Sequence, residues 1–299
     1  MAFALSYDDP SIAAGMRRVA QSQIASGLRD LSDDSLNQNQ VVLAVRKRCK
    51  KLRGLVRLFQ EPFPDYQDEN SRFRDLARKL SDARESTALL DALDRLSVTF
   101  SDELDEEIFL PLRERLLAQR RHLTETYIAS LLNEAATVFM DSQQRIQTWH
   151  LTALGADAFE TGLMKTYQRA RRLMAEADAS RDVETIHEWR KHTKYHWHHL
   201  RLIRACWPPV MAGYLSVADK MAKALGEHHD LALLKTHGAA LLCGDHQPVF
   251  NALNAAASLR QVEIEEHAFR YGRKLFSERP TDAARRYANW WSAGRAQLG

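Results

Sequence analysis

Cysteine is scarce in this 299-residue chain, which has only Cys49, Cys206 and Cys243. The three are widely spaced and form no CxxC motif, so the sequence indicates neither a disulfide framework nor a thiolate metal site. We expect all three to be small buried apolar residues. A chain of this length buries enough apolar surface to fold without disulfides or a structural metal.

Long apolar runs are absent as well. No stretch approaches the roughly 18 residues that a membrane-spanning helix needs, and residues 1–10 lack the basic segment that opens a secretory signal. The sequence therefore predicts a cytoplasmic protein that does not enter a membrane. It also lacks a P-loop, a Rossmann fingerprint, a GxSxG motif and a Cys/His nucleophile pattern, so no cofactor is expected.

Glycine and proline are few, 12 and 8, and they separate long segments with a helical period. Apolar residues recur every three or four positions over residues 41–59 and again over 186–203, and two prolines follow each segment closely. The sequence therefore predicts an all-α protein. Helices are expected at residues 10–31, 38–60, 66–80, 83–97, 103–140, 157–178, 182–206, 210–225, 229–243, 248–276 and from about 281.

Two parts of the chain look like copies of each other. Superposing Arg46 on Arg190, an offset of 144 residues, aligns the basic residues around them. Residues 80–85 then correspond to residues 225–230 at an offset of 145. We interpret the two matches as an internal duplication. The predicted halves are residues 1–145 and 146–299.

Charge is distributed unevenly, although the net charge of +3 indicates no particular partner. Residues 41–57 contain seven cations and no acid, whereas residues 102–107 contain five acids in six positions. Solvated helices usually alternate the two signs of charge. The segregation therefore favours an anionic ligand over a merely solvated surface.

The first basic segment places its charges on one helix face. Arg46, Lys50, Arg53 and Arg57 follow each other at steps of four, three and four, and so point in similar directions. Like charges at these spacings repel by a few tenths of a kcal/mol per pair. Solvent or an anion must offset that repulsion.

The second basic segment is rich in histidine. Its periodicity places His187, Lys191, Lys194, His198 and Arg201 on one helix face. Lysine offers phosphate a strong point charge, arginine offers paired donors, and neutral histidine offers one ring N–H. Basic faces in two related halves predict a common groove for an anion.

Metal-dependent alternatives fit the spacing less well. His229 and Asp230 form a His-Asp doublet, but a metallophosphohydrolase needs further ligands in an order that is not seen here. His192 and His196 have the spacing of two metal ligands, but no third ligand stands at a suitable distance. We prefer the interpretation that Asp230 and Glu85 orient neighbouring basic side chains.

In combination, these segments resemble the CHAD family, the conserved histidine α-helical domain. Its pattern of a histidine with basic residues or tyrosine at +3, +4, +7 and +8 is similar to His187, Arg190, Lys191, Lys194 and Tyr195. Its LGxxHDLxxL pattern is matched by residues 225–234, and residues 165–172 are similar to its basic Tyr-Arg stretch. Leu43 stands where the first half would have the histidine. The resemblance covers roughly residues 6–276.

The resemblance implies two four-helix bundles related by a pseudo-twofold axis. Their basic helices would line a central groove or pore that holds inorganic polyphosphate, without catalysis, in a protein associated with polyphosphate granules. A nucleic-acid-binding protein and, less well supported, a metal-dependent phosphohydrolase using His229 and Asp230 are the alternatives. The residues expected to bind polyphosphate are Arg46, Lys47, Lys50, Lys51, Arg53, Arg84, Lys165, Arg169, His187, Arg190, Lys191, Lys194 and His229.

Overall fold

The computed structural model describes residues 3–121, 125–242 and 244–297, and within these ranges it contains helices and no strand. The all-α prediction is confirmed. No helix in the described ranges is long and apolar enough to cross a membrane. The α-helices are α1 (Ile12–Leu31), α2 (Gln38–Leu58), α3 (Tyr66–Lys79), α4 (Ser81–Thr99), α5 (Leu110–Arg121), α6 (Glu125–Arg145), α7 (Asp157–Ser180), α8 (Val183–Leu202), α9 (Pro208–Leu241), α10 (Gln247–Leu275) and α11 (Pro280–Ala296).

Both basic segments form helices with a side-chain cap at the N-terminus. Asn37 and Gln40 make a reciprocal capping box that starts α2. The carboxylate of Asp182 accepts a hydrogen bond of 2.8 Å from the backbone N–H of Thr185 and starts α8 in the same way. Each cap fixes where its helix begins, and so which way its basic side chains point.

Two expected boundaries were wrong. The expected helix at residues 103–140 is divided into a 3-10 turn (Glu106–Phe109), α5 and α6. Conversely, the break expected between 225 and 229 does not occur, because α9 continues through Gly226. A glycine inside a helix costs about 1 kcal/mol relative to alanine, and burial of Leu225 and Leu231 on either side outweighs that cost. His229 and Asp230 therefore lie within a helix rather than at the start of one.

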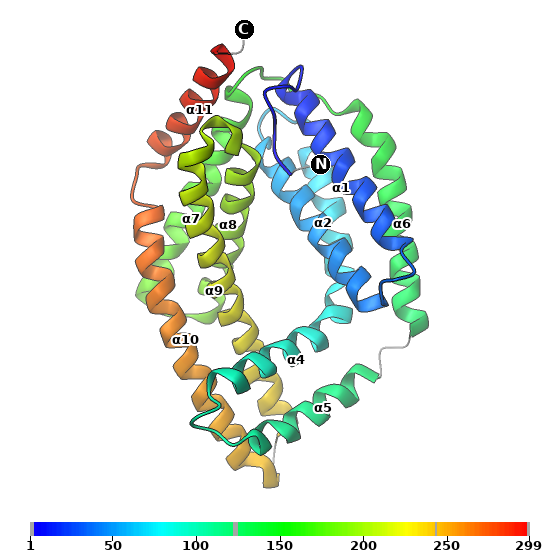
Figure 1. Ribbon diagram of the computed structural model, residues 1–299, viewed down its shortest axis with the longest axis vertical. Helices are drawn as coiled ribbons and strands as arrows, with labels where there is room; N and C mark the ends of the chain where they lie inside the picture. The colour runs from blue at the N-terminus through cyan, green and yellow to red at the C-terminus, as the bar shows by residue number, and fades with distance from the viewer. Residues whose placement is uncertain (1–2, 122–124, 243, 298–299) are drawn as a thin grey trace.

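Figure 1 shows two groups of helices joined at one end by α4 and α5. One group contains α1, α2 and α6, and the other contains α7 to α11. The helices α2 and α8 come close together in the upper part of the view, and they diverge towards their N-termini. In Figure 1, α4 crosses below the space between them and packs against α9.

Apolar packing is shared across the predicted boundary between residues 145 and 146. The larger apolar cluster includes Val45 and Leu55 of α2, Trp189 of α8 and Leu225 of α9. A smaller cluster joins α4 and α5 to the second half of α9 and the first half of α10. In chain order, α1 and α2 of the first half correspond to α7 and α8 of the second. The two successive helices α3 and α4 then correspond to the single helix α9. The duplication and the division into two bundles stay predictions.

Candidate functional site

The two basic helices touch at Gly54 of α2 and His198 of α8. A Cβ on Gly54 would lie only 2.9 Å from the Cβ of His198, so the approach requires a residue without a side chain. The Nε2–H of His199 donates to the carbonyl oxygen of Gly54 over 3.1 Å. His198 was expected on the basic face, but it is buried at this crossing. The crossing fixes α2 relative to α8.

One turn before this crossing, Lys50 lies among charges from three helices. Its ammonium interacts with Arg46 on α2, with Arg190 and Lys194 on α8, and with the carboxylate of Asp230 on α9. The residue is exposed to solvent. Desolvation, followed by the neighbouring cations, lowers the pKa of Lys50 to about 8. We call this group the central cluster; its members are Arg46, Lys50, His187, Arg190, Lys194, His229 and Asp230.

Lys194, on the other basic helix, is one of the cations that act on Lys50. Its Nζ lies 3.7 Å from the centre of the Trp197 ring and 3.9 Å from an oxygen of Asp219. Burial, together with the charges of Arg201, Lys223 and Arg190, lowers the pKa of Lys194 to about 8, and the carboxylate of Asp219 opposes this shift. A second lysine of the central cluster therefore holds its proton weakly.

Two histidines from different helices stack within the central cluster. The ring centres of His187 on α8 and His229 on α9 are 3.8 Å apart, and a guanidinium nitrogen of Arg190 lies 3.5 Å from Nδ1 of His187. Burial and nearby Arg190 lower the pKa of His187 to about 3 and that of His229 to about 4. Both rings are neutral at pH 7 and offer N–H donors rather than charge.

Two acids near the basic side chains are paired with residues on other helices. Asp230 forms an ion pair of 3.0 Å with Arg95 of α4, and Glu85 lies 3.0 Å from Nε2 of His237. His228, next to the cluster, is bonded instead to Glu265 at 3.0 Å. Within the described residues, no group of three or more His, Cys, Asp or Glu is arranged to hold a metal ion.

On one flank of the helix crossing, cations gather over Phe3. Nζ of Lys51 lies 5.8 Å from the centre of the Phe3 ring, and the guanidinium carbon of Arg201 lies 5.4 Å from it. Burial and the charges of Arg48 and Arg201 lower the pKa of Lys51 to about 8. Lys47 is exposed beside it. Arg201 was not among the predicted binding residues, although the offset of 144 pairs it with Arg57.

On the opposite flank, two arginines of α2 lie over Tyr195 of α8. The guanidinium carbon of Arg57 is 4.4 Å from the ring centre and that of Arg53 is 5.7 Å from it. Arg53 also donates to the side-chain oxygen of Asn70 over 3.3 Å. The stripe of four cations predicted on α2 is thus divided, with Lys50 in the central cluster and Arg53 and Arg57 on Tyr195.

Lys191, Lys165 and Arg169, which were also predicted to bind, are not among the residues whose charges act on Lys50. Lys191 is exposed and paired with Glu188 at 2.5 Å, although its charge also acts on both stacked histidines. Lys165 on α7 forms an ion pair with Glu61, and Arg169 is half-buried on the same helix. The side chain of Arg84 lies outside the described residues.

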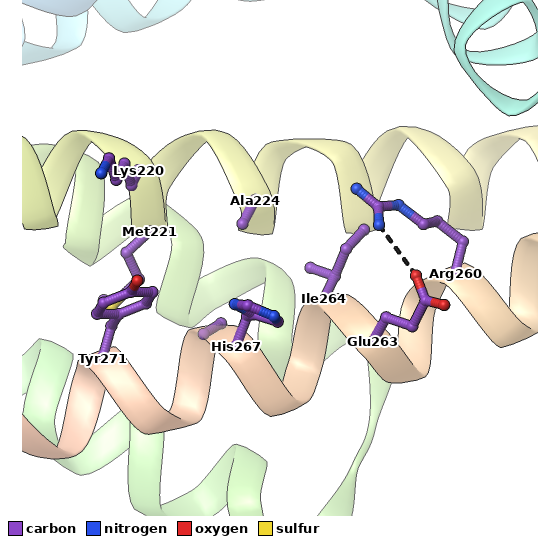
Figure 2. A pocket seen from close by; sticks show the side chains of 9 residues that line it. Lys220, Met221, Ala224, Arg260, Glu263, Ile264, His267 and Tyr271 are labelled. Atoms are coloured by element: carbon purple, nitrogen blue, oxygen red, sulfur yellow. Dashed lines mark hydrogen bonds and ion pairs between the residues drawn. The ribbon is translucent and has the colours of Figure 1, made fainter. Parts of the chain in front are cut away.

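A separate pocket lies between α9 and α10 (Figure 2). It measures about 290 Å³, and Lys220, Arg260 and His267 stand around an apolar floor that includes Ile264. Arg260 is held by Glu227 and Glu263, so little of its charge is available to a ligand. None of the predicted binding residues lines this pocket.

Comparison with known proteins identifies the family. The family model described as "CHAD domain" matches residues 19–239, a span that includes α2, α8 and the part of α9 with His229. No curated protein matches the chain. The match covers well over half of the sequence and spans the crossing of the two basic helices. The chain therefore belongs to the CHAD domain family.

Proposed function

We propose that this protein binds inorganic polyphosphate through the central cluster and catalyses no reaction on it. One observation carries the proposal: Lys50 of α2 lies among Arg190 and Lys194 of α8, so cations from two distant segments act on one place. Polyphosphate is the general association of the CHAD family, which supports this choice of anion.

The chemistry of the cluster suits a phosphate chain. Polyphosphate displays no sequence, so a binding protein needs only charge, spacing and donor geometry. Lysine supplies point charges, and arginine supplies paired N–H donors that match phosphate oxygens. The cations of the cluster repel one another in the free protein. The attraction of each cation to a bound polyanion offsets that repulsion. As with nucleic acids, binding should release counterions and weaken steeply with salt.

A charge-reversal experiment tests the proposal. Long-chain polyphosphate is titrated into the wild type, into Lys50→Glu/Lys194→Glu, and into a control, Lys220→Glu/Lys274→Glu, whose exposed lysines lie outside the cluster. Both pairs change the net charge equally. We expect the cluster pair to weaken binding by about tenfold or more and the control by no more than about twofold. Equal weakening by both pairs would refute a defined site.

Nucleic acid is the main competing ligand, because the same charges attract its phosphates. The test is displacement of labelled polyphosphate by RNA or DNA at matched charge and salt. We expect polyphosphate to be the better competitor. Preferential displacement by nucleic acid would assign the site to that polymer instead.

Catalysis is tested directly. Asp230 would be the metal-binding carboxylate of a phosphohydrolase, whereas in the structure it forms an ion pair with Arg95. We expect no phosphate release when purified protein is incubated with polyphosphate or nucleoside triphosphates and Mn²⁺ or Mg²⁺. Metal-dependent release that Asp230→Ala abolishes would establish an enzyme.

The cellular counterpart of the proposal is association with polyphosphate granules. A fluorescently tagged chain should colocalise with granules, and the tagged Lys50→Glu/Lys194→Glu variant should not. Granule localisation that the variant retains would mean that another surface is responsible.

A further inference from the structure

We propose that a long polyphosphate chain continues from the central cluster onto a second subsite, in which Arg201 and Lys51 bind further phosphates that a short chain does not reach. We call this subsite the Phe3 flank; its members are Phe3, Lys51, Trp197 and Arg201. The inference rests on the proposed function and adds to it a dependence on the length of the ligand.

Arg201 lies against two aromatic rings. Its guanidinium carbon is 4.7 Å from the ring centre of Trp197, on its own helix, and 5.4 Å from that of Phe3. Each ring also has a second cation, since Nζ of Lys194 is 3.7 Å from the centre of Trp197 and Nζ of Lys51 is 5.8 Å from the centre of Phe3. Positive charge therefore continues from Lys194, in the central cluster, through Arg201 to Lys51.

The Phe3 ring is fixed in its place. Its side chain is buried and packs edge-on against the ring of His198, with the ring centres 5.6 Å apart. The backbone N–H of Leu5 donates to the carbonyl oxygen of Leu202 over 2.8 Å, which ties the N-terminal segment to the end of α8. Because the face of an aromatic ring attracts cations, Phe3 holds both of its neighbouring charges at this flank.

The offset of 144 residues relates the two flanks of the crossing. It pairs Arg201 with Arg57 and Lys51 with Tyr195. On the other flank, the guanidinium carbon of Arg57 lies 4.4 Å from the centre of the Tyr195 ring, a contact that is attractive without an anion. The corresponding pair on the Phe3 flank consists of two cations, which repel each other. A bound phosphate offsets that repulsion.

The two cations have no counterion of their own. Within the part of the chain that the structure describes, neither Lys51 nor Arg201 forms an ion pair. The carboxylates whose charges act on them, Asp30 and Asp219, are each in an ion pair with a different cation, at 3.0 Å and 2.8 Å. Both side chains are half-buried, so a ligand has access to them. The Phe3 flank thus offers unpaired positive charge to an anion.

The separation of the two subsites selects for length. Lys194 and Arg201 are about two turns apart on one face of α8, which is about 10 Å along the helix. A long chain spans this separation, whereas pyrophosphate does not. At the Phe3 flank the guanidinium supplies paired N–H donors and the ammonium supplies a point charge, as in the central cluster.

Binding of two ligands of different length tests the subsite. Long-chain polyphosphate and pyrophosphate are titrated into the wild type and into Arg201→Gln. We expect the variant to weaken long-chain binding by about fivefold or more and pyrophosphate binding by no more than about twofold. For the long chain, it should also lower the slope of the logarithm of the binding constant against that of salt concentration by about 0.7–0.9.

Three further variants complete the design. Arg285→Gln removes one positive charge at an exposed position of α11 and should change the binding of either ligand by no more than about twofold. Lys51→Gln removes the second cation of the Phe3 flank and should repeat the selective loss. Arg201→Lys keeps the charge and should bind the long chain more tightly than Arg201→Gln does. Urea unfolding verifies that each variant is folded, and Lys51→Gln decides if Arg201→Gln is not.

The outcomes separate this inference from the proposed function. If the wild type binds neither ligand, the proposed function fails. If Lys50→Glu/Lys194→Glu weakens long-chain binding but Arg201→Gln and Lys51→Gln do not, or if these two weaken the binding of both ligands equally, only the second subsite is overturned. It is overturned as well if Arg201→Lys binds the long chain as weakly as Arg201→Gln, because the charge then plays no part.

Discussion

Gly54 of α2 and His198 of α8 lie against each other, and they are 144 residues apart, the same offset that relates Arg46 to Arg190. Corresponding positions of the two predicted copies therefore meet. At a twofold axis an element contacts its own equivalent, so this pair is where such an axis would pass. The contact also explains why the two basic helices stay close enough for Lys50 and Lys194 to interact.

Alanine at Gly54 should destabilise the protein. Its Cβ would lie 2.9 Å from the Cβ of His198, which forces the two helices apart. We expect the free energy of unfolding in urea to fall by about 1–3 kcal/mol, as for other overpacked sites. Gly226→Ala is the control, because a Cβ there meets no atom within 4 Å; it should stabilise α9 by about 0.5–1 kcal/mol. Equal stability of the Gly54 variant and the wild type would contradict the close contact.

Acid should destabilise the fold through three buried histidines of α8. Burial holds the pKa of His196 at about 3 and places those of His198 and His199 well below the ordinary value of 6.5. The unfolded chain therefore binds more protons below pH 6.5, and stability falls as the pH falls from there. Each histidine contributes a loss of about 1.4 kcal/mol per pH unit. Urea unfolding from pH 7 to 5 measures this loss.

His196 allows that mechanism to be checked at one position. Neither of its ring nitrogens has a hydrogen-bond partner among the described residues, and it packs between the rings of Tyr167 and Phe276. His196→Leu should therefore make the pH dependence less steep, whereas His150→Leu, at an exposed position, should leave it unchanged. An unchanged slope in the His196 variant would place the acid sensitivity elsewhere.

The dependence of the binding constant on salt concentration should indicate how many cations of the cluster contact phosphates. The logarithm of the binding constant is expected to fall linearly with the logarithm of salt concentration, and removing one phosphate contact should lower the slope by about 0.7–0.9. Lys50→Gln should show that change. Lys274→Gln, at an exposed position of α10, should leave the slope as it is. The idea fails if the two variants give the same slope.

Lys165 should matter less than Lys50, although both were predicted to bind. Lys165 is already paired with Glu61, which follows the C-terminal end of α2, whereas Lys50 is acted on mainly by the cations Arg46, Arg190 and Lys194. We expect Lys165→Glu to weaken polyphosphate binding by less than about threefold and Lys50→Glu to weaken it several-fold more. Comparable losses, measured at one salt concentration, would extend the site onto α7.

The features that were predicted correctly from the sequence are those that depend on the spacing of nearby residues, such as the positions of helices. Apolar residues every three or four positions located α2 and α8 to within a few residues, because helix periodicity is local. The break at 225–229 was predicted wrongly, since packing around Gly226 overrides the weak preference of a single glycine. Local spacing likewise gives no information on which helix lies opposite a side chain.

The stripe of four cations predicted on α2 shows why local spacing is not enough to predict the surroundings of a side chain. Lys50 and Arg53 share a face of α2 by periodicity, yet α8 crosses at Gly54 and brings Tyr195 to Arg53 while leaving Lys50 among Arg190 and Lys194. Only the crossing point decides between the two environments. His229 could be assigned to the site because its position in the duplication and the family pattern carried long-range information.

The unbroken course of α9 has a mechanical consequence. Its first half belongs to the larger apolar cluster through Leu225, and its second half belongs to the smaller one through Leu231 and Leu234. A continuous helix kinks sharply only where its hydrogen bonds are disturbed, so a tilt of the end formed by α4 and α5 is passed along α9 to His229. The spacing between that end and the basic helices α2 and α8 is thus set by one continuous helix rather than by a flexible loop.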